Sequence, residues 1–166
     1  SYDFDATPNK ETQISSANNS SDSTNSFEIF NKKAEINFEH KSSDWLNRLI
    51  RSYTTSYAEG VIKLAIPPAF GGSGVACEDI NNDGLIDVLL LGGFGNKLFL
   101  NSKDGNFKDI TEISKINKWN EDNSSYGEPR QPIIADFNND GTQDIFISYV
   151  NEKHRMLKNI NGKQFE

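Results

Sequence analysis

The chain has 166 residues, which suits about one domain, and a formal net charge of −7. That charge argues against a nucleic-acid-binding surface, which needs clustered Lys and Arg. The single cysteine, Cys77, excludes an internal disulfide and a cysteine-based zinc site, and no run of 18 apolar residues is long enough for a membrane-spanning helix.

Residues 1–26 are rich in Ser, Asn, Thr and Asp and nearly lack large aliphatic side chains. Such a segment buries too little apolar surface to offset the entropy of ordering it. We therefore expect a flexible leader or tether. In an envelope protein it would act as a spacer from a membrane anchor, such as a lipid-modified cysteine upstream of Ser1.

The next unit, residues 27–106, begins with "FEIFNKKAEI" and contains one helical insertion, "SSDWLNRLIRSY". Its apolar residues Leu46, Leu49, Ile50 and Tyr53 have helix spacing, and Ser43 or Asp44 can cap its start. We expect this helix, within residues 43–57, to pack on the outside of the sheets. The strand that follows, "GVACEDI", is expected to bury Cys77 as a small apolar side chain.

A second unit, residues 107–166, opens with "FKDITEISKI", which repeats the Phe-led start of the first unit. A long polar loop, "NKWNEDNSSYGEPRQP", separates this start from further strand-like runs. The apolar runs in both units are short, rich in β-branched or aromatic residues, and bounded by Gly, Asn and Asp, as strands are. Phe165 would open a third copy.

About four strands per unit, repeated along the chain, predict an all-β fold of β-propeller blades. Two blades do not close a propeller, because closure takes roughly four to eight, and an open pair leaves unpaired strand edges. We therefore expect two four-stranded blades of a larger propeller, with the remaining blades or a membrane complex as partners.

Each unit contains an acidic nonamer with the pattern D-x-N-x-D-G-x-x-D, followed at once by an apolar strand. Carboxylate and amide oxygens at alternate positions of a curling loop can meet at one Ca²⁺ ion, and the glycine allows the sharp turn between ligands. The pattern predicts two Ca²⁺ ions, with a backbone carbonyl at position seven and turn glycines Gly84 and Gly141. The predicted ligands are Asp79, Asn81, Asp83, Leu85 and Asp87, and Asp136, Asn138, Asp140, Thr142 and Asp144.

Three alternatives compete with calcium blades. An EF-hand needs a bidentate Glu at position twelve between two helices, where this chain has Leu90 and Ile147 within strands. Magnesium prefers strict octahedral geometry and retains its waters, so it fits less well. The third alternative is a pair of metal-free Asx-rich turns, since Asn-Asp-Gly is a strong turn sequence; the repetition of every side-chain ligand favours calcium.

The stretch "GVACEDINNDGLIDVLLLGGFGNKLFLNSKDGNFKDIT" resembles an FG-GAP or VCBS-type repeat, the calcium-loop blade of integrin alpha-subunit propellers and many secreted bacterial proteins. With "INFEH" upstream, the arrangement is similar to bacterial proteins in which such repeats accompany an ASPIC/UnbV-type region. The resemblance implies that the Asp and Asn residues of the nonamers bind calcium. It also implies a seven-bladed or similar propeller outside the cytoplasm.

No nucleophile and base pair, metalloprotease motif or phosphate-binding loop occurs in the sequence, whose only histidines are His40 and His154. We therefore expect a non-enzymatic module that makes protein or glycan contacts at the cell surface, without nucleic acid. Its location would be extracellular or on the cell surface, including attachment as a bacterial outer-membrane lipoprotein. Alternatives are a scaffold within a secreted polysaccharide-active enzyme, or an accessory subunit of an outer-membrane uptake or secretion complex.

Overall fold

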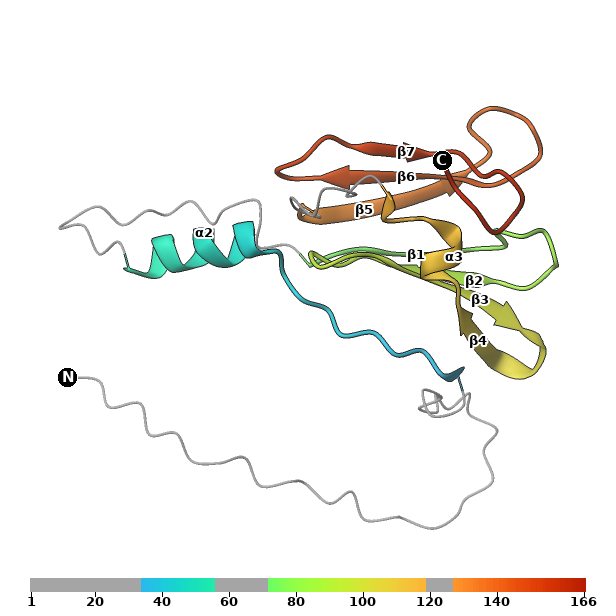
Figure 1. Ribbon diagram of the computed structural model, residues 1–166, viewed down its shortest axis with the longest axis horizontal. Helices are drawn as coiled ribbons and strands as arrows, with labels where there is room; N and C mark the ends of the chain where they lie inside the picture. The colour runs from blue at the N-terminus through green and yellow to red at the C-terminus, as the bar shows by residue number, and fades with distance from the viewer. Residues whose placement is uncertain (1–33, 56–71, 119–126) are drawn as a thin grey trace, which may run out of the picture.

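The computed structural model describes residues 34–55, 72–118 and 127–166, and within them the fold is all-β with little helix (Figure 1). Two antiparallel sheets lie one against the other. The first has the strand order β1-β2-β3-β4 and the second has the order β5-β6-β7. This architecture agrees with the predicted pair of propeller blades with one short helical insertion.

The elements follow the chain in a simple up-and-down order. Their bounds are α2 Asp44–Thr55, β1 Val75–Glu78, β2 Asp87–Leu90, β3 Lys97–Ser102, η2 Lys103–Gly105, β4 Asn106–Asp109, α3 Thr111–Ser114, β5 Pro129–Ala135, β6 Asp144–Tyr149 and β7 Arg155–Leu157. Each nonamer therefore connects the first two strands of a sheet. Its final aspartate is the first residue of β2 in one sheet and of β6 in the other.

The second sheet has three strands, and a bridge marks the position of a fourth. Asn159 pairs with Phe165, as Asn101 pairs with Phe107 between β3 and β4. Two backbone hydrogen bonds between Lys158 and Glu166, of 2.8 and 3.0 Å, extend this bridge. Phe165 thus occupies the same place in the second sheet as Phe107 does in the first.

The hydrophobic core lies between the two sheets. Strands β2 and β6 alternate buried and less buried residues, because successive side chains point to opposite faces of a sheet. The buried residues of the first unit and of the turn after α3 are Ile80, Leu89, Leu91, Leu98, Leu100, Ile110 and Ile116. Those of the second sheet are Ile145, Ile147, Tyr149, Leu157 and Phe165.

The segment before α2 packs against the first sheet. The Gly93 amide donates to the Lys41 carbonyl at 2.9 Å, which ties the segment to the turn between β2 and β3. Glu35 and Lys115, which hold the same place in the two Phe-led repeats, have backbone φ angles of 55° and 58°. The shared left-handed conformation supports the expectation that these segments are one structural element used twice.

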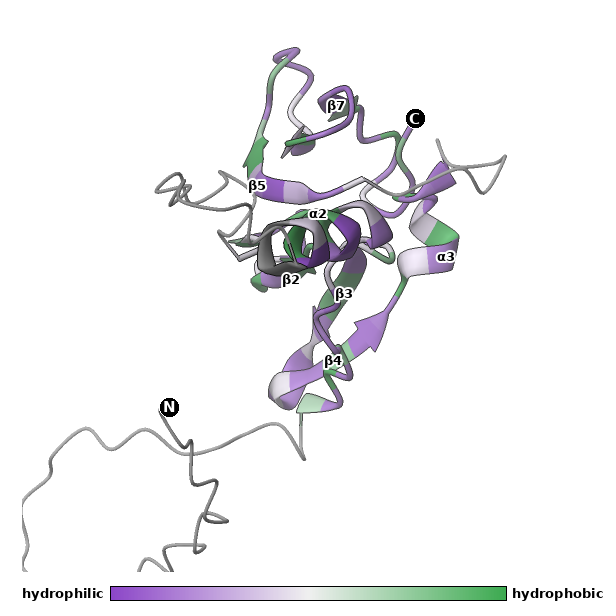
Figure 2. Cartoon of the chain, turned by 90° about the vertical axis from the view of Figure 1, so that its left-hand side faces the viewer, coloured by the Kyte–Doolittle hydropathy of each residue, from purple (hydrophilic) through white to green (hydrophobic). Residues whose placement is uncertain are grey.

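Helix α2 starts where the capping pattern predicted. The Ser43 hydroxyl accepts the Leu46 N–H at 3.3 Å, and the Ser43 N–H donates to the buried carboxylate of Glu128 at 2.8 Å. Leu46 is buried, but the helix projects beyond the strand ends and does not lie on the outside of a sheet (Figures 1 and 2). Beyond the first turn, Leu49 and Ile50 are only half-buried, so the expected packing on the outside of the sheets is wrong there.

Cys77 is exposed, contrary to the expectation that it is buried. On β1 the side chains that face the second sheet are partly covered, and those on the opposite face, including Cys77, are exposed. Some predictions lie outside the described residues: the leader at 1–26, the start of the first Phe-led segment, and the middle half of the long polar loop. The last four residues of that predicted loop, 129–132, belong instead to β5, so the expected loop is wrong there. Within the described ranges, no helix is long and apolar enough to cross a membrane.

Candidate metal centre

The two nonamers form loops with the same backbone conformation. The first loop comprises residues 79–87 and the second residues 136–144. Asn82 and Asn139 both have φ of 58°, and Gly84 and Gly141 have φ of 84° and 85°. The left-handed region suits Asn and Gly far better than other residues, which explains why the Asn-Asp-Gly sequence occurs at both turns.

In the first loop, side-chain oxygens fold back over the backbone. Asp79 accepts the N–H groups of Asp83 and Gly84 through its two carboxylate oxygens, at 3.0 and 2.7 Å. The Asn81 oxygen accepts the same Asp83 N–H at 3.1 Å, and Asp83 accepts the Leu85 N–H at 2.9 Å. Because Asp79 and Asn81 share one donor, their oxygens lie next to each other above the loop.

The second loop repeats this network bond for bond. Asp136 accepts the N–H groups of Asp140 and Gly141 at 3.1 and 2.9 Å, and the Asn138 oxygen shares the Asp140 donor at 2.9 Å. Asp140 accepts the Thr142 N–H at 3.0 Å, and the Thr142 hydroxyl donates to the same oxygen. The residues at positions one, three and five of the nonamer therefore have the same geometry in both loops.

The ninth position differs from the others, because its carboxylate is buried and accepts backbone N–H groups of its own repeat. Asp87 is fully buried and accepts the Ile80 N–H at 3.0 Å and the Asn101 N–H at 2.8 Å. Asp144, also buried, accepts the Asn159 N–H at 2.8 Å. This aspartate thus fastens each loop to the next strand or turn, a role that its place in the motif did not reveal.

The acids of the first loop act on each other electrostatically. The pKa of the Asp87 carboxyl lies above its ordinary value. Burial is the largest cause and the negative charges of Asp83 and Asp79 add to it, whereas the hydrogen bonds from the N–H groups of Asn101 and Ile80 oppose it. In the second loop, hydrogen bonds from Thr142 hold the pKa of Asp140 below its ordinary value. The mutual repulsion of Asp79, Asp83 and Asp87 is the condition that a bound cation would relieve.

The donor types suit calcium, but the carboxylates are not gathered around one point. Within the part of the chain that the structure describes, no three His, Cys, Asp or Glu side chains lie close enough together to hold a metal ion. The Asn81 amide donates to Asp83 at 2.9 Å, as the Asn138 amide donates to Asp140 at 2.8 Å. Calcium would have to replace these two amide contacts. Each oxygen of Asp87 retains a further lone-pair direction for a ligand role.

The loops lie side by side at the end of the sheets remote from α2 (Figure 1) and contact each other. The Asn82 side-chain nitrogen donates to the Gly141 carbonyl at 3.1 Å. The Asn159 side-chain nitrogen donates to the Ile80 carbonyl at 3.1 Å and to the Gln143 carbonyl at 3.0 Å. Neither Asn82 nor Asn159 was predicted from the sequence. Asn101 and Asn159 hold matching positions in the two repeats, each after β-strand residues, and this match was the signal that could have pointed to Asn159.

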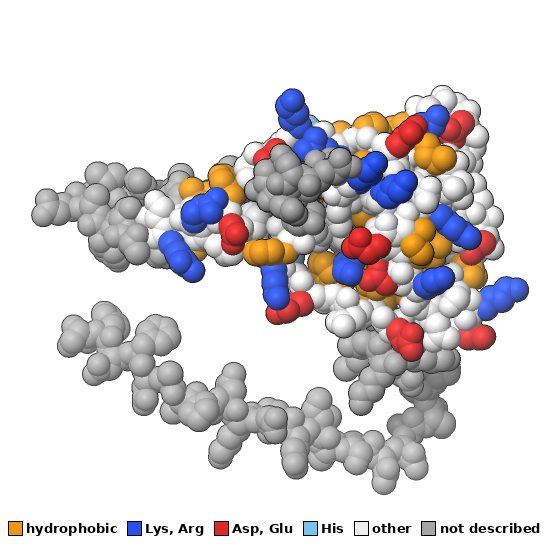
Figure 3. All heavy atoms as spheres, viewed as in Figure 1, with side chains coloured by type: hydrophobic (Ala, Val, Ile, Leu, Met, Phe, Trp, Pro, Cys, Tyr) orange, Lys and Arg blue, Asp and Glu red, His pale blue; other side chains and the backbone are white. Residues whose placement is uncertain are grey.

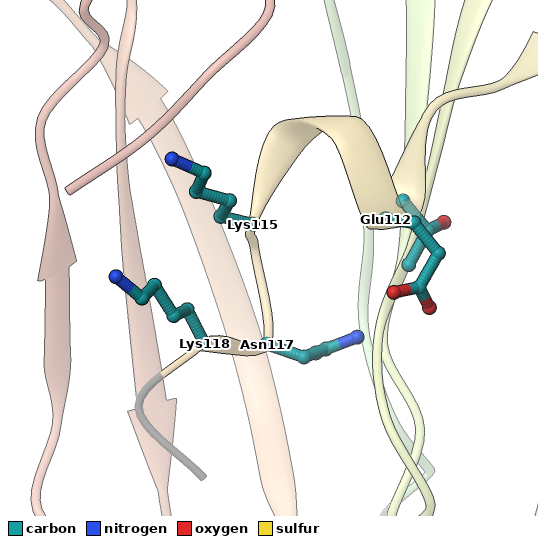
Figure 4. A pocket seen from close by; sticks show the side chains of 5 residues that line it. Glu112, Lys115, Asn117 and Lys118 are labelled. Carbon is teal, nitrogen blue, oxygen red and sulfur yellow. The ribbon is translucent and has the colours of Figure 1, made fainter. Parts of the chain in front are cut away.

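A hollow of about 300 Å³ lies beside α3. It is lined by Thr111, Glu112, Lys115, Asn117 and Lys118. In Figure 4 the two lysines extend toward the second sheet, whereas Glu112 and Asn117 point toward the first. The Thr111 hydroxyl accepts the Leu98 N–H, and the Asn117 amide bonds the backbone of Asn96. On the face in Figure 3, Lys and Arg side chains are interspersed with Asp and Glu.

Comparison with known protein families finds an FG-GAP-like repeat at residues 79–147. The match starts at the first residue of the first loop and ends within β6, so it covers both acidic loops. The chain finds no match among curated proteins. The repeat indicates a β-propeller type of module, in agreement with the two packed antiparallel sheets.

Proposed function

From the FG-GAP-like repeat at residues 79–147, we propose that the chain is a calcium-stabilised, non-enzymatic β-propeller module that works outside the cytoplasm. Its two loops would each hold one Ca²⁺, and its function would be to present fixed loop surfaces to a protein or glycan partner. In the VCBS and ASPIC/UnbV-type proteins that it resembles, such blades form parts of larger extracellular chains.

The observation that carries this proposal is the repetition of one hydrogen-bond network in two loops. Asp79 and Asp136 each accept the N–H groups of the fifth and sixth loop residues. A turn needs one or two residues of special geometry, whereas these loops hold four oxygen-bearing side chains in equal register. These oxygens would supply part of the six to eight hard ligands that Ca²⁺ takes, with the backbone carbonyl at position seven and water completing the set.

The ion would act structurally. The first loop joins β1 to β2 and the second joins β5 to β6, so a cation bound in either loop would hold one hairpin together. The residues that would supply oxygens are those predicted from the motif, with Leu85 and Thr142 contributing backbone carbonyls. Relief of repulsion among Asp79, Asp83 and Asp87 would then stabilise the folded state.

The exposure of the loops supports a location with abundant calcium. Asp83 and Asp140 are exposed, so the ion would exchange with solvent. Sites in extracellular modules have dissociation constants of about 10⁻⁴ to 10⁻³ M. Such sites are occupied outside cells and empty at cytosolic calcium concentrations.

Thermal unfolding with and without calcium tests the proposal. We expect the melting temperature of the 166-residue chain to rise when millimolar Ca²⁺ replaces a chelator, because a ligand that binds only the folded state stabilises it. The double variant Asp83→Ala, Asp140→Ala should lose this rise, whereas Asp104→Ala, an exposed acid outside both loops, should keep it. A wild-type melting temperature that is the same in calcium and chelator contradicts the proposal.

A further inference from the structure

The two acidic loops meet at one peptide unit of the second loop. The Asn82 side-chain nitrogen of the first loop donates to the Gly141 carbonyl at 3.1 Å. The N–H group of the same peptide unit belongs to Thr142 and donates to the Asp140 carboxylate at 3.0 Å. The first loop therefore holds one side of this peptide unit, and a predicted calcium ligand of the second loop holds the other side.

The residue that makes this contact lies between two predicted ligands of its own loop. Asn82 is at position four of the first nonamer, between Asn81 and Asp83. A change in the direction of either neighbour turns the backbone between them, and so moves the Asn82 side chain. Asn139 has the same position in the second loop and the same φ of 58°, but its side chain makes no hydrogen bond among the described residues.

A second connection between the loops runs through the interior. The Ile80 N–H donates to the Asp87 carboxylate at 3.0 Å, and the Ile80 carbonyl accepts the Asn159 side-chain nitrogen at 3.1 Å. The Asn159 backbone N–H donates in turn to the Asp144 carboxylate at 2.8 Å. All four residues are buried. A continuous series of hydrogen bonds thus joins the two carboxylates at position nine, and breaking one leaves a buried polar group without a partner.

The turn that contains Asn159 also packs against the first loop. The Gly162 N–H donates to the Asn159 side-chain oxygen at 2.6 Å. A Cβ atom on Gly162 would lie only 2.9 Å from the Cα atom of Asn81, a predicted ligand. This close approach leaves the first loop little room to move without the turn.

We propose that the two acidic loops are energetically coupled, so that ordering of either loop orders the other, through Asn82 at the surface and Asn159 in the interior. The coupling is a property of the chain without metal. Its consequence for metal binding rests on the proposed function: calcium in one loop would raise the calcium affinity of the other. Linkage requires the factor to be the same in both directions, and such factors commonly lie between about 5 and 150.

Amide hydrogen exchange of the 166-residue chain in chelator tests the coupling without metal. Asp79→Ala removes the carboxylate that accepts two N–H groups of the first loop, and so loosens that loop. We expect exchange of the Gly141 and Thr142 amides in the second loop to accelerate by about fivefold. The Leu98 amide of β3, which donates to a side chain of the first unit, reports general loss of stability and should accelerate much less.

Asn82→Gly tests the connection at the surface, because glycine adopts a φ of 58° without strain and only the side chain is lost. In this background, Asp79→Ala should accelerate exchange at Gly141 and Thr142 by less than half of the factor found with Asn82 present. Asn139→Gly is the matched control. It makes the same change at the same φ and the same position of the nonamer, but removes no contact between the loops, so the full factor should remain.

Calorimetric titration with calcium measures the consequence for binding. Asp83→Ala and Asp140→Ala each leave one intact loop, and so give the binding constant of each site alone. Coupling predicts that the product of the two binding constants of the wild-type chain exceeds the product of these single-site constants by about fivefold. Asn82→Gly should reduce this excess, and Asn139→Gly should not.

Several results would overturn the proposal. Asp79→Ala could accelerate exchange in the first loop alone, could accelerate Leu98 as much as Gly141, or could act on the second loop undiminished when Asn82 is replaced. Two calcium ions that bind with the product of the single-site constants would also contradict it, and would leave the proposed function standing. A chain that binds no calcium would contradict the proposed function alone, because the exchange measurements in chelator still decide whether the loops are coupled.

Discussion

Asn159 in the second sheet donates a 3.1 Å hydrogen bond from its side-chain nitrogen to the backbone carbonyl of Ile80 in the first loop. The same nitrogen donates to Gln143 at 3.0 Å, and the side-chain oxygen accepts the Gly162 N–H at 2.6 Å. Asn159 is 2% exposed. One buried amide thus joins the two repeats and positions both acidic loops.

Replacing Asn159 by Ala should destabilise the chain by about 3 kcal/mol, because it leaves several buried backbone groups without partners. Its counterpart Asn101 is only partly buried and its side chain bonds a single carbonyl, that of Ile86. Asn101→Ala should therefore cost about 1 kcal/mol. Urea unfolding of the two variants measures the difference, and equal losses would show that the bond to Ile80 does not join the repeats energetically.

Gly84→Ala and Gly141→Ala should each cost about 1–2 kcal/mol through backbone strain. Both glycines have positive φ, and an added Cβ would meet no atom within 4 Å, so no steric clash contributes. Gly72→Ala is the matched control, since its surroundings are equally open and its φ is not positive. Chemical denaturation in chelator checks this prediction. A neutral effect at both loop glycines would show that the loops tolerate another backbone conformation.

Asp87→Asn should destabilise the chain in chelator by about 2 kcal/mol. The carboxylate accepts two N–H groups, from Ile80 and Asn101, whereas an amide can accept with only one of its two ends and turns an NH₂ toward the other donor. Asp104→Asn makes the same charge change at an exposed position and should be silent. Comparable losses in the two variants would indicate that charge, and not the bonded geometry, sets the effect.

Tyr149 should ionise only at strongly alkaline pH. Burial raises its pKa from 10.0 to about 12, against the opposing effects of the Asn96 hydrogen bond and the Arg155 charge. Since the folded-state pKa lies above the unfolded value, the stabilisation is complete below about pH 10 and is lost as the pH rises toward 12. Difference absorbance of tyrosinate, with Tyr149→Phe as reference, measures this. Ionisation at the ordinary tyrosine pKa would mean that the ring is not buried.

The features that could be predicted from the sequence were those determined by interactions between residues close together in the chain. The nonamer pattern predicted a sharp turn at its glycine, where Gly84 has a positive φ, and the pattern around Ser43 predicted the start of α2. Alternating apolar runs after each nonamer predicted β2 and β6. In each case the relevant interactions lie within a few residues of chain.

The remaining features depend on contacts between strands or between sheets, whose residues are far apart in the sequence. Position nine of the motif could not show that Asp87 turns toward Asn101, because that bond spans two strands. The exposure of Cys77 followed from which face of β1 the second sheet covers. Asn159 was not singled out in the sequence, because its bond to Ile80 joins residues that are 79 positions apart.

The number of calcium ions bound per chain tests the central claim most directly. Equilibrium dialysis at a few millimolar Ca²⁺, above the dissociation constants of about 10⁻⁴ to 10⁻³ M expected for extracellular modules, should find two ions per wild-type chain. Asp83→Ala and Asp140→Ala should each leave one ion, and Asp104→Ala should leave two. A wild-type chain that binds no calcium under these conditions would identify the loops as metal-free Asx turns and contradict the account.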